Sequence, residues 1–91
     1  ELDRLTKQFM SLINWGTKNK VIYTANLAPA EYTELLKLFF ENLKETDYAY
    51  KVCKTGEIFE SALYGRELIS KEDEQCFTDN IKTILSYGKN K

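Results

Sequence analysis

Three stretches of the chain place apolar residues at helical spacing. The first covers residues 2–15, and the second, about 29–45, begins with Pro29, which suits a first helical turn. The third lies in ISKEDEQCFTDNIKTILSYG (69–88), where Ser70 is a predicted N-cap followed by acidic residues. The apolar stripe of the first stretch consists of Leu2, Leu5, Phe9, Leu12 and Ile13. These patterns predict three helices.

The second stretch is predicted to bury one broad side. Its apolar residues are Tyr32, Leu35, Leu36, Phe39, Phe40 and Leu43. Leu38 falls off this stripe, among glutamates. The chain's four glycines stand alone at positions 16, 56, 65 and 88, and each is interpreted as the end of a helix or a turn. Gly16 in particular is predicted to lie just past the end of the first helix.

Other segments have the composition of β-strands. KVIYTA (20–25) is short and rich in β-branched residues, and predicts one strand. Residues 48–54 and 57–64 flank a Thr-Gly step and predict a hairpin. In that hairpin Lys54 would lie opposite Glu57, and Val52 opposite Phe59, so that unlike charges and apolar side chains pair.

Together these elements predict an α+β fold: a small mixed three-stranded sheet with three helices, in the order α-β-α-β-β-α. The alternative is an all-α bundle, because the period of a short apolar run does not separate a strand from a helix. At 91 residues, the chain is interpreted as a single domain over residues 1–91, with 89–91 as a frayed tail.

Composition narrows the classes of function. The chain contains no histidine, which excludes the common Ser–His and Cys–His nucleophile pairs, and it has no glycine-rich phosphate loop. Formal net charge is −1, and no apolar stretch approaches the ~20 residues that span a bilayer. We therefore expect a protein that is not an enzyme, with no cofactor, metal or membrane partner. The missing initiator methionine indicates a processed product or an excised piece.

Cys53 and Cys76 offer three interpretations. They could form a disulfide that closes a 24-residue loop, worth ~3 kcal/mol in the chain-entropy model. Cys53, with Lys51 and Lys54 nearby to favour a thiolate, could instead serve a thiol-dependent redox factor. The third interpretation, which we favour, is that both cysteines are ordinary, partly buried thiols. This is what we expect of a cytoplasmic rather than an exported protein.

Two segments suggest contact with nucleic acid. WGTKNK and YGKNK each join an aromatic residue to a basic tail, which could stack a base and hold a phosphate. The basic segments are 16–20 and 88–91, and the candidate residues are Lys18, Lys20, Lys89 and Lys91. The same pattern also occurs at ordinary helix ends, and the balanced net charge disfavours a nucleic-acid partner.

Residues without a clear structural role point to protein binding. Trp15 and Leu38 fall off their helical stripes, while Tyr64 and Arg66 bracket Gly65. Tryptophan, tyrosine and arginine are enriched at binding hot spots. We therefore interpret the chain as a non-enzymatic interaction module: an adaptor, an inhibitor or immunity-type protein, or a binding domain of a larger chain. Self-association through a strand edge at residues 21–24 is a variant of this interpretation.

Overall fold

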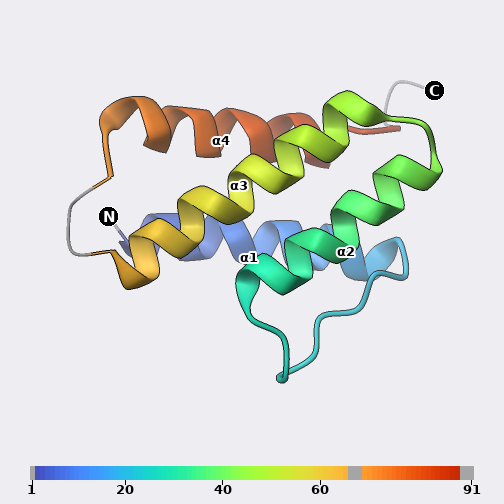
Figure 1. Cartoon of the computed structure of the whole chain (residues 1–91), viewed down its shortest axis with the longest axis horizontal. Coiled ribbons are helices and arrows are strands. Elements are labelled where there is room, and N and C mark those ends of the chain that lie inside the picture. The colour runs from blue at the N-terminus through green and yellow to red at the C-terminus, as the bar shows by residue number, and fades with distance from the viewer. Residues whose placement is uncertain (1, 66–68, 89–91) are drawn as a thin grey trace.

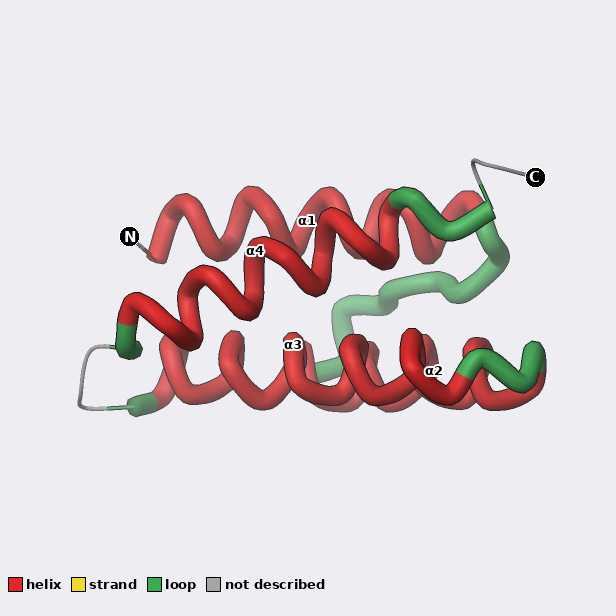
Figure 2. Tube along the Cα trace, turned by 90° about the horizontal axis from the view of Figure 1, so that it is seen from above, coloured by secondary structure: helices red, strands yellow, loops and turns green. Residues whose placement is uncertain are grey.

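The computed structural model describes residues 2–65 and 69–88, and the secondary structure of this part consists of α-helices joined by loops and turns, with no strand. Its four α-helices are α1 (Leu2–Lys18), α2 (Pro29–Asn42), α3 (Thr46–Tyr64) and α4 (Lys71–Leu85). They form two layers, with α1 beside α4 and α2 beside α3 (Figures 1 and 2). Helix α3 runs antiparallel to both α2 and α4, whereas α1, α2 and α4 all run in the same direction (Figure 1).

The hydrophobic core draws on all four helices. Its buried apolar residues are Leu5, Phe9, Leu12, Tyr32, Leu36, Phe40, Ala49, Val52, Ile58, Phe59, Phe77, Ile81 and Ile84. Three of them form what we call the closed phenylalanine cluster: Phe9 stacks on Phe59 with ring centroids 4.4 Å apart, and Phe59 lies 5.9 Å from Phe77. This cluster joins α1, α3 and α4 at the centre of the bundle.

The predicted α+β fold and its β-hairpin are wrong, because residues 48–64 lie within the single helix α3. The residues that the predicted hairpin pairs also lie on one face of a helix, so their pattern did not distinguish the two structures. Val52 and Phe59, opposed in the predicted hairpin, are seven residues apart, which is two helical turns, and both are buried. The alternation of a strand would place Tyr50 on the same face as Val52, yet Tyr50 is 69% exposed, whereas Val52 is fully buried. The all-helical alternative is correct.

Gly56 lies inside α3, at a point where α2 passes too close to leave room for a side chain. A Cβ atom at Gly56 would overlap the Thr33 hydroxyl and would lie 3.0 Å from the Thr33 Cβ. Rotating the Thr33 side chain cannot move its own Cβ, so this seam requires glycine. The residue that suggested a turn in the sequence is therefore a close contact between two helices.

The predicted strand at 20–25 is also wrong, because residues 21–24 belong to the connection from α1 to α2 and have no partner strand among the described residues. Since α1 and α2 run in the same direction, this connection has to return along the bundle (Figure 2). The buried Tyr32 holds it in place: its hydroxyl donates to the Val21 carbonyl at 2.7 Å. The predicted self-association through a strand edge at 21–24 therefore loses the strand on which it rested.

The structure confirms one predicted helix cap and corrects the predicted ends of two helices. Ser70 is confirmed as an N-cap, since its hydroxyl accepts from the Asp73 N–H at 3.0 Å. Gly16 does not follow α1 but lies inside it, where a Cβ would overlap the Tyr32 hydroxyl. Helix α2 ends at Asn42, earlier than the predicted residue 45.

Helices α1 and α2 both end in Schellman motifs whose left-handed residue is a lysine. Lys20 has a φ of 70°, and the next residue, Val21, donates from its N–H to the Gly16 carbonyl at 2.8 Å. Lys44 has a φ of 64°, and Glu45 donates in the same way to the Phe40 carbonyl at 2.9 Å. Glycine is the residue that takes this conformation without strain. Both helix ends therefore carry a lysine at a local energetic cost.

None of the described helices is both long enough and apolar enough to cross a membrane.

Candidate functional site

One end of the bundle carries a group of rings that is open to solvent, which we call the open aromatic cluster. It consists of Trp15, Phe39, Phe40, Tyr48 and Tyr87. These residues come from the last turns of α1 and α2, the first turn of α3 and the residues after α4, which meet at the right-hand end of Figure 1. Phe40 is fully buried at its centre, whereas the other rings are partly exposed.

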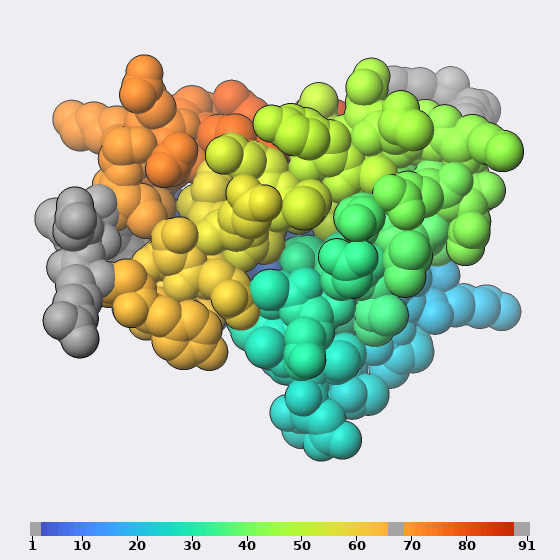
Figure 3. Space-filling model, viewed as in Figure 1, coloured from blue at the N-terminus to red at the C-terminus, as the bar shows by residue number. Residues whose placement is uncertain are grey.

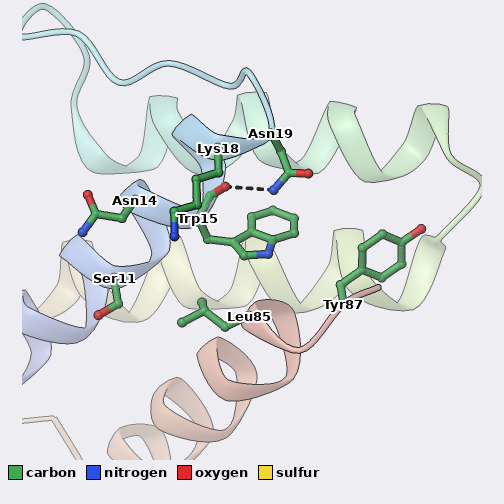
Figure 4. Close-up of a pocket in the computed structure, with 7 residues that line it drawn as sticks. All are labelled: Ser11, Asn14, Trp15, Lys18, Asn19, Leu85 and Tyr87. Carbon is green, nitrogen blue, oxygen red and sulfur yellow. Dashed lines mark hydrogen bonds between the residues drawn. The ribbon is translucent and has the colours of Figure 1, made fainter. Parts of the chain in front are cut away.

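Trp15 forms part of an open pocket of about 380 Å³, which we call the Trp15 pocket. Its lining residues are Ser11, Asn14, Trp15, Lys18, Asn19, Leu85 and Tyr87. In Figure 4 the indole lies at the centre, with the polar residues of α1 around one side and Leu85 and Tyr87 around the other. One indole face stacks on Phe40, with ring centroids 5.6 Å apart and an interplanar angle of 15°.

Hydrogen bonds hold the walls of the Trp15 pocket. The Asn19 side-chain amide donates to the Trp15 carbonyl at 2.9 Å, the bond drawn in Figure 4, so the amide oxygen of Asn19 is left as an acceptor. The Tyr87 hydroxyl donates to the Glu45 carboxylate at 3.2 Å. The Tyr87 ring also lies 4.9 Å from Tyr48 and 5.3 Å from Phe40. The Asn19 wall is therefore held by a bond between two lining residues, and the Tyr87 wall by contacts outside the pocket.

The structure brings the two aromatic-basic segments of the sequence together. Trp15 and Lys18 from the first segment share the Trp15 pocket with Tyr87 from the second. Lys20 follows as the left-handed residue after α1. Lys89 and Lys91 lie outside the described residues. The sequence analysis did not identify Asn19 and Leu85 as candidate site residues. They could be recognised only once the C-terminal ends of α1 and α4 were known to lie together.

Of the four residues proposed for protein binding, the three that the structure describes lie in different parts of the molecule. Trp15 belongs to the pocket, and Tyr64 is 70% exposed at the far end of α3. Arg66 lies outside the described residues. Leu38 is 47% exposed on α2, and Leu35, one turn before it, is 40% exposed. Leu35 had been assigned to the buried side; six apolar residues were more than one buried helical face requires.

Leu35 and Leu38 lie among carboxylates. We call the surface formed by Glu31, Glu34, Leu35, Leu38 and Glu41 the α2 outer face, and all five side chains are exposed. In Figure 3 the side chains of α2 form part of the molecular surface along the length of the helix.

The one lysine of α2 is already paired with a carboxylate. Lys37 donates to Glu34 at 3.2 Å. This hydrogen bond and the charges of Glu34 and Glu41 raise the pKa of Lys37 above its ordinary value. With three glutamates against one lysine, α2 is a net acidic helix.

Cys53 and Cys76 are free thiols in this structure. Each has a partner within its own helix: the Cys53 thiol lies 3.8 Å from the Glu57 carboxylate, and the Asn80 amide donates to the Cys76 sulfur at 3.5 Å. The predicted disulfide and redox role gain no support from these contacts. Among the described residues, no cluster of histidine, cysteine, aspartate and glutamate is suited to a metal ion.

Comparisons with protein-family models, with characterised proteins and with solved structures find no match to this chain.

Proposed function

We propose that the protein is a non-enzymatic interaction module whose α2 outer face binds an amphipathic, basic helix of a partner protein. The observation that carries the proposal is the pair Leu35 and Leu38, one helical turn apart, 40% and 47% exposed and surrounded by glutamates. Side chains three residues apart on a helix are neighbours, so the two leucines form one continuous apolar contact. Apolar anchors spaced along a helix are the usual feature by which one helix recognises another.

Charge distinguishes a foreign partner from a second copy of the chain. A symmetric dimer through the α2 outer face would bring Glu31, Glu34 and Glu41 of one copy towards the same residues of the other. Like charges at an interface cost binding energy and suppress the wrong partner. A helix with lysine or arginine on either side of an apolar stripe would instead neutralise the acidic face, so we expect the isolated protein to be monomeric.

The test is site-specific photo-crosslinking in the native cell, with a benzophenone amino acid introduced at position 38. We expect a discrete crosslinked partner, whose crosslinked peptide has apolar residues at helical spacing and flanking basic residues. Substituting Leu35→Glu in the same chain is expected to abolish the adduct, because it places a charge inside the contact. Both leucines are exposed, so folding should be almost unaffected.

Met10 provides the matched control, since it is 50% exposed on α1. The Met10→Glu substitution should leave the adduct at position 38 intact, and a benzophenone at position 10 should not capture the same partner. Equal capture from positions 10 and 38, or an adduct that survives Leu35→Glu, would contradict the proposal. A crosslink between two copies of this chain would contradict the choice of occupant.

A further inference from the structure

We propose that the Trp15 pocket binds a nucleobase that carries a phosphate, with the base stacked on the indole and the phosphate held by Lys18. This activity is separate from the α2 outer face and does not depend on it. The phosphorylated base could belong to a free nucleotide or to a single strand of nucleic acid. The two sources share this chemistry, and the experiment below separates them.

The indole offers a stacking surface that is fixed in place. Phe40 supports one face, and the Phe39 ring meets the indole edge-on with centroids 6.0 Å apart. None of the described rings stacks on the opposite face. The indole lies among the other residues that line the pocket (Figure 4). Each base has a flat π-face, so a preorganised aromatic surface binds it with little loss of conformational entropy.

Polar groups around the indole match the edge of a base. The side chain of Asn14 has no hydrogen-bond partner among the described residues, and the Asn19 amide oxygen remains an acceptor. An asparagine amide offers both a donor and an acceptor, as do the edges of nucleobases. The pocket volume of about 380 Å³ falls at the lower end of the ~300–1,000 Å³ typical of small-ligand sites.

Lysines lie at this end of the bundle together with the Glu45 carboxylate, which accepts a hydrogen bond from Tyr87. Three helices, α1, α2 and α4, place their C-termini here, and the partial negative charge of each would repel a phosphate. Lys18 and Lys20 counter that charge at α1, and Lys44 does so at α2. Two of these lysines adopt left-handed conformations that glycine would take without strain. Among these lysines, Lys18 lines the Trp15 pocket and is the cation placed to hold the phosphate.

The single tryptophan of the chain makes the test direct, because Trp15 is both the fluorophore and the proposed stacking surface. The probes are adenosine 5′-monophosphate, adenosine, ribose 5-phosphate, inorganic phosphate and a short single-stranded oligoadenylate. Fluorescence titrations, repeated by calorimetry, should show saturable quenching by the monophosphate and the oligoadenylate. Adenosine should bind more weakly, and the two probes without a base should not quench.

Two substitutions separate the roles of stacking and charge. Lys18→Gln should lower the affinity for adenosine monophosphate about tenfold and leave the affinity for adenosine unchanged. Lys7→Gln, which removes a lysine from an exposed position on the same helix, should change neither. Trp15→Leu should abolish the binding heat of both ligands while the helical circular-dichroism spectrum is retained.

Three results would overturn the proposal: no saturable binding of any base-containing probe, equal binding of inorganic phosphate, or an affinity for the monophosphate that is unchanged in Lys18→Gln. If the site binds, an oligoadenylate at least tenfold tighter than the monophosphate assigns it to single-stranded nucleic acid. Equal affinities assign it to a free nucleotide. Leu35→Glu should affect neither probe, so failure here is distinguishable from failure of the α2 outer face.

Discussion

The closed phenylalanine cluster and the open aromatic cluster are built from similar ring contacts but differ in what surrounds them. Phe9, Phe59 and Phe77 are at most 4% exposed. In the open cluster only Phe40 is fully buried, and Tyr48, Tyr87 and Trp15 reach the surface with polar atoms at their edges. Ring centroids lie 4.4–5.9 Å apart in the first cluster and 4.9–6.0 Å apart in the second.

The difference shows how one interaction can serve two purposes. A buried ring with no polar atom contributes only burial and packing, so its worth is measured in stability. A half-exposed tryptophan supported by a buried phenylalanine contributes less to stability but presents a rigid surface to a ligand. We therefore expect substitutions in the closed cluster to affect folding and substitutions in the open cluster to affect binding.

The largest expected effect is that of Phe59→Ala, which empties the centre of the closed cluster. Removing a fully buried phenylalanine typically lowers the free energy of unfolding by about 3–5 kcal/mol. Tyr48→Ala in the open cluster should cost clearly less, because Tyr48 is only partly buried. Urea unfolding followed by circular dichroism measures both, and Phe59→Leu serves as a milder variant if Phe59→Ala does not fold. Equal losses at positions 48 and 59 would remove the distinction between the clusters.

A smaller effect is expected at Tyr32, which is fully buried yet carries a hydroxyl. Tyr32→Phe leaves the Val21 carbonyl without its donor and should cost about 1–2 kcal/mol at neutral pH. Chemical unfolding of the variant beside the wild type measures this loss. A loss near zero would mean that water replaces the hydroxyl and that the connection from α1 to α2 is held by other contacts.

The same residue predicts a dependence on pH. Burial raises the pKa of Tyr32 from 10.0 to about 12. Between these values the unfolded chain releases the proton more readily than the folded chain, so the contribution of Tyr32 to stability is present below pH 10 and is lost as pH rises towards 12. The difference in unfolding free energy between wild type and Tyr32→Phe should therefore shrink over this interval. A constant difference would contradict the raised pKa.

The smallest expected effect is a gain in stability. Lys20→Gly relieves a left-handed backbone and should raise the free energy of unfolding by about 0.5–1 kcal/mol. Lys20→Ala is the control, because it removes the charge and keeps the strain, and it should give no gain. Thermal unfolding in parallel distinguishes the two. If Lys20→Ala stabilises as much as Lys20→Gly, the cost lies in charge repulsion and not in the backbone.

The sequence revealed α1, α2 and α4 because their stripes and caps are local. The Ser70 cap and the position of Pro29 at the start of α2 need no knowledge of neighbours. Helix α3 was hidden by Gly56, whose role depends on Thr33 in another helix. The spacing of Val52 and Phe59 fits a hairpin as well as a helix. The interpretation of Gly56 as a turn then favoured the hairpin, which is wrong.

The candidate sites were predictable only in part for a related reason. Leu38 could be recognised as exposed from its helical position alone. Trp15, Lys18 and the aromatic-basic segment around Tyr87 were each noticed, but only the parallel arrangement of α1 and α4 brings them into one pocket. That arrangement brings together residues 70 positions apart, such as Arg4 with Glu74 and Gln8 with Thr78, and no local pattern encodes such contacts.

The same long-range contacts bear on how the protein is made. Helices α2 and α3 are neighbours in sequence and can associate while the chain is still being synthesised, but α1 finds its layer partner only in α4. During translation α1 leaves the ribosome before the other three helices, and the face that carries Leu5, Phe9 and Leu12 lacks its α4 partner until Lys71–Leu85 has emerged. We expect the nascent chain to need a chaperone most during this interval. We also expect that a pause in translation before α4 would lower the yield of folded protein.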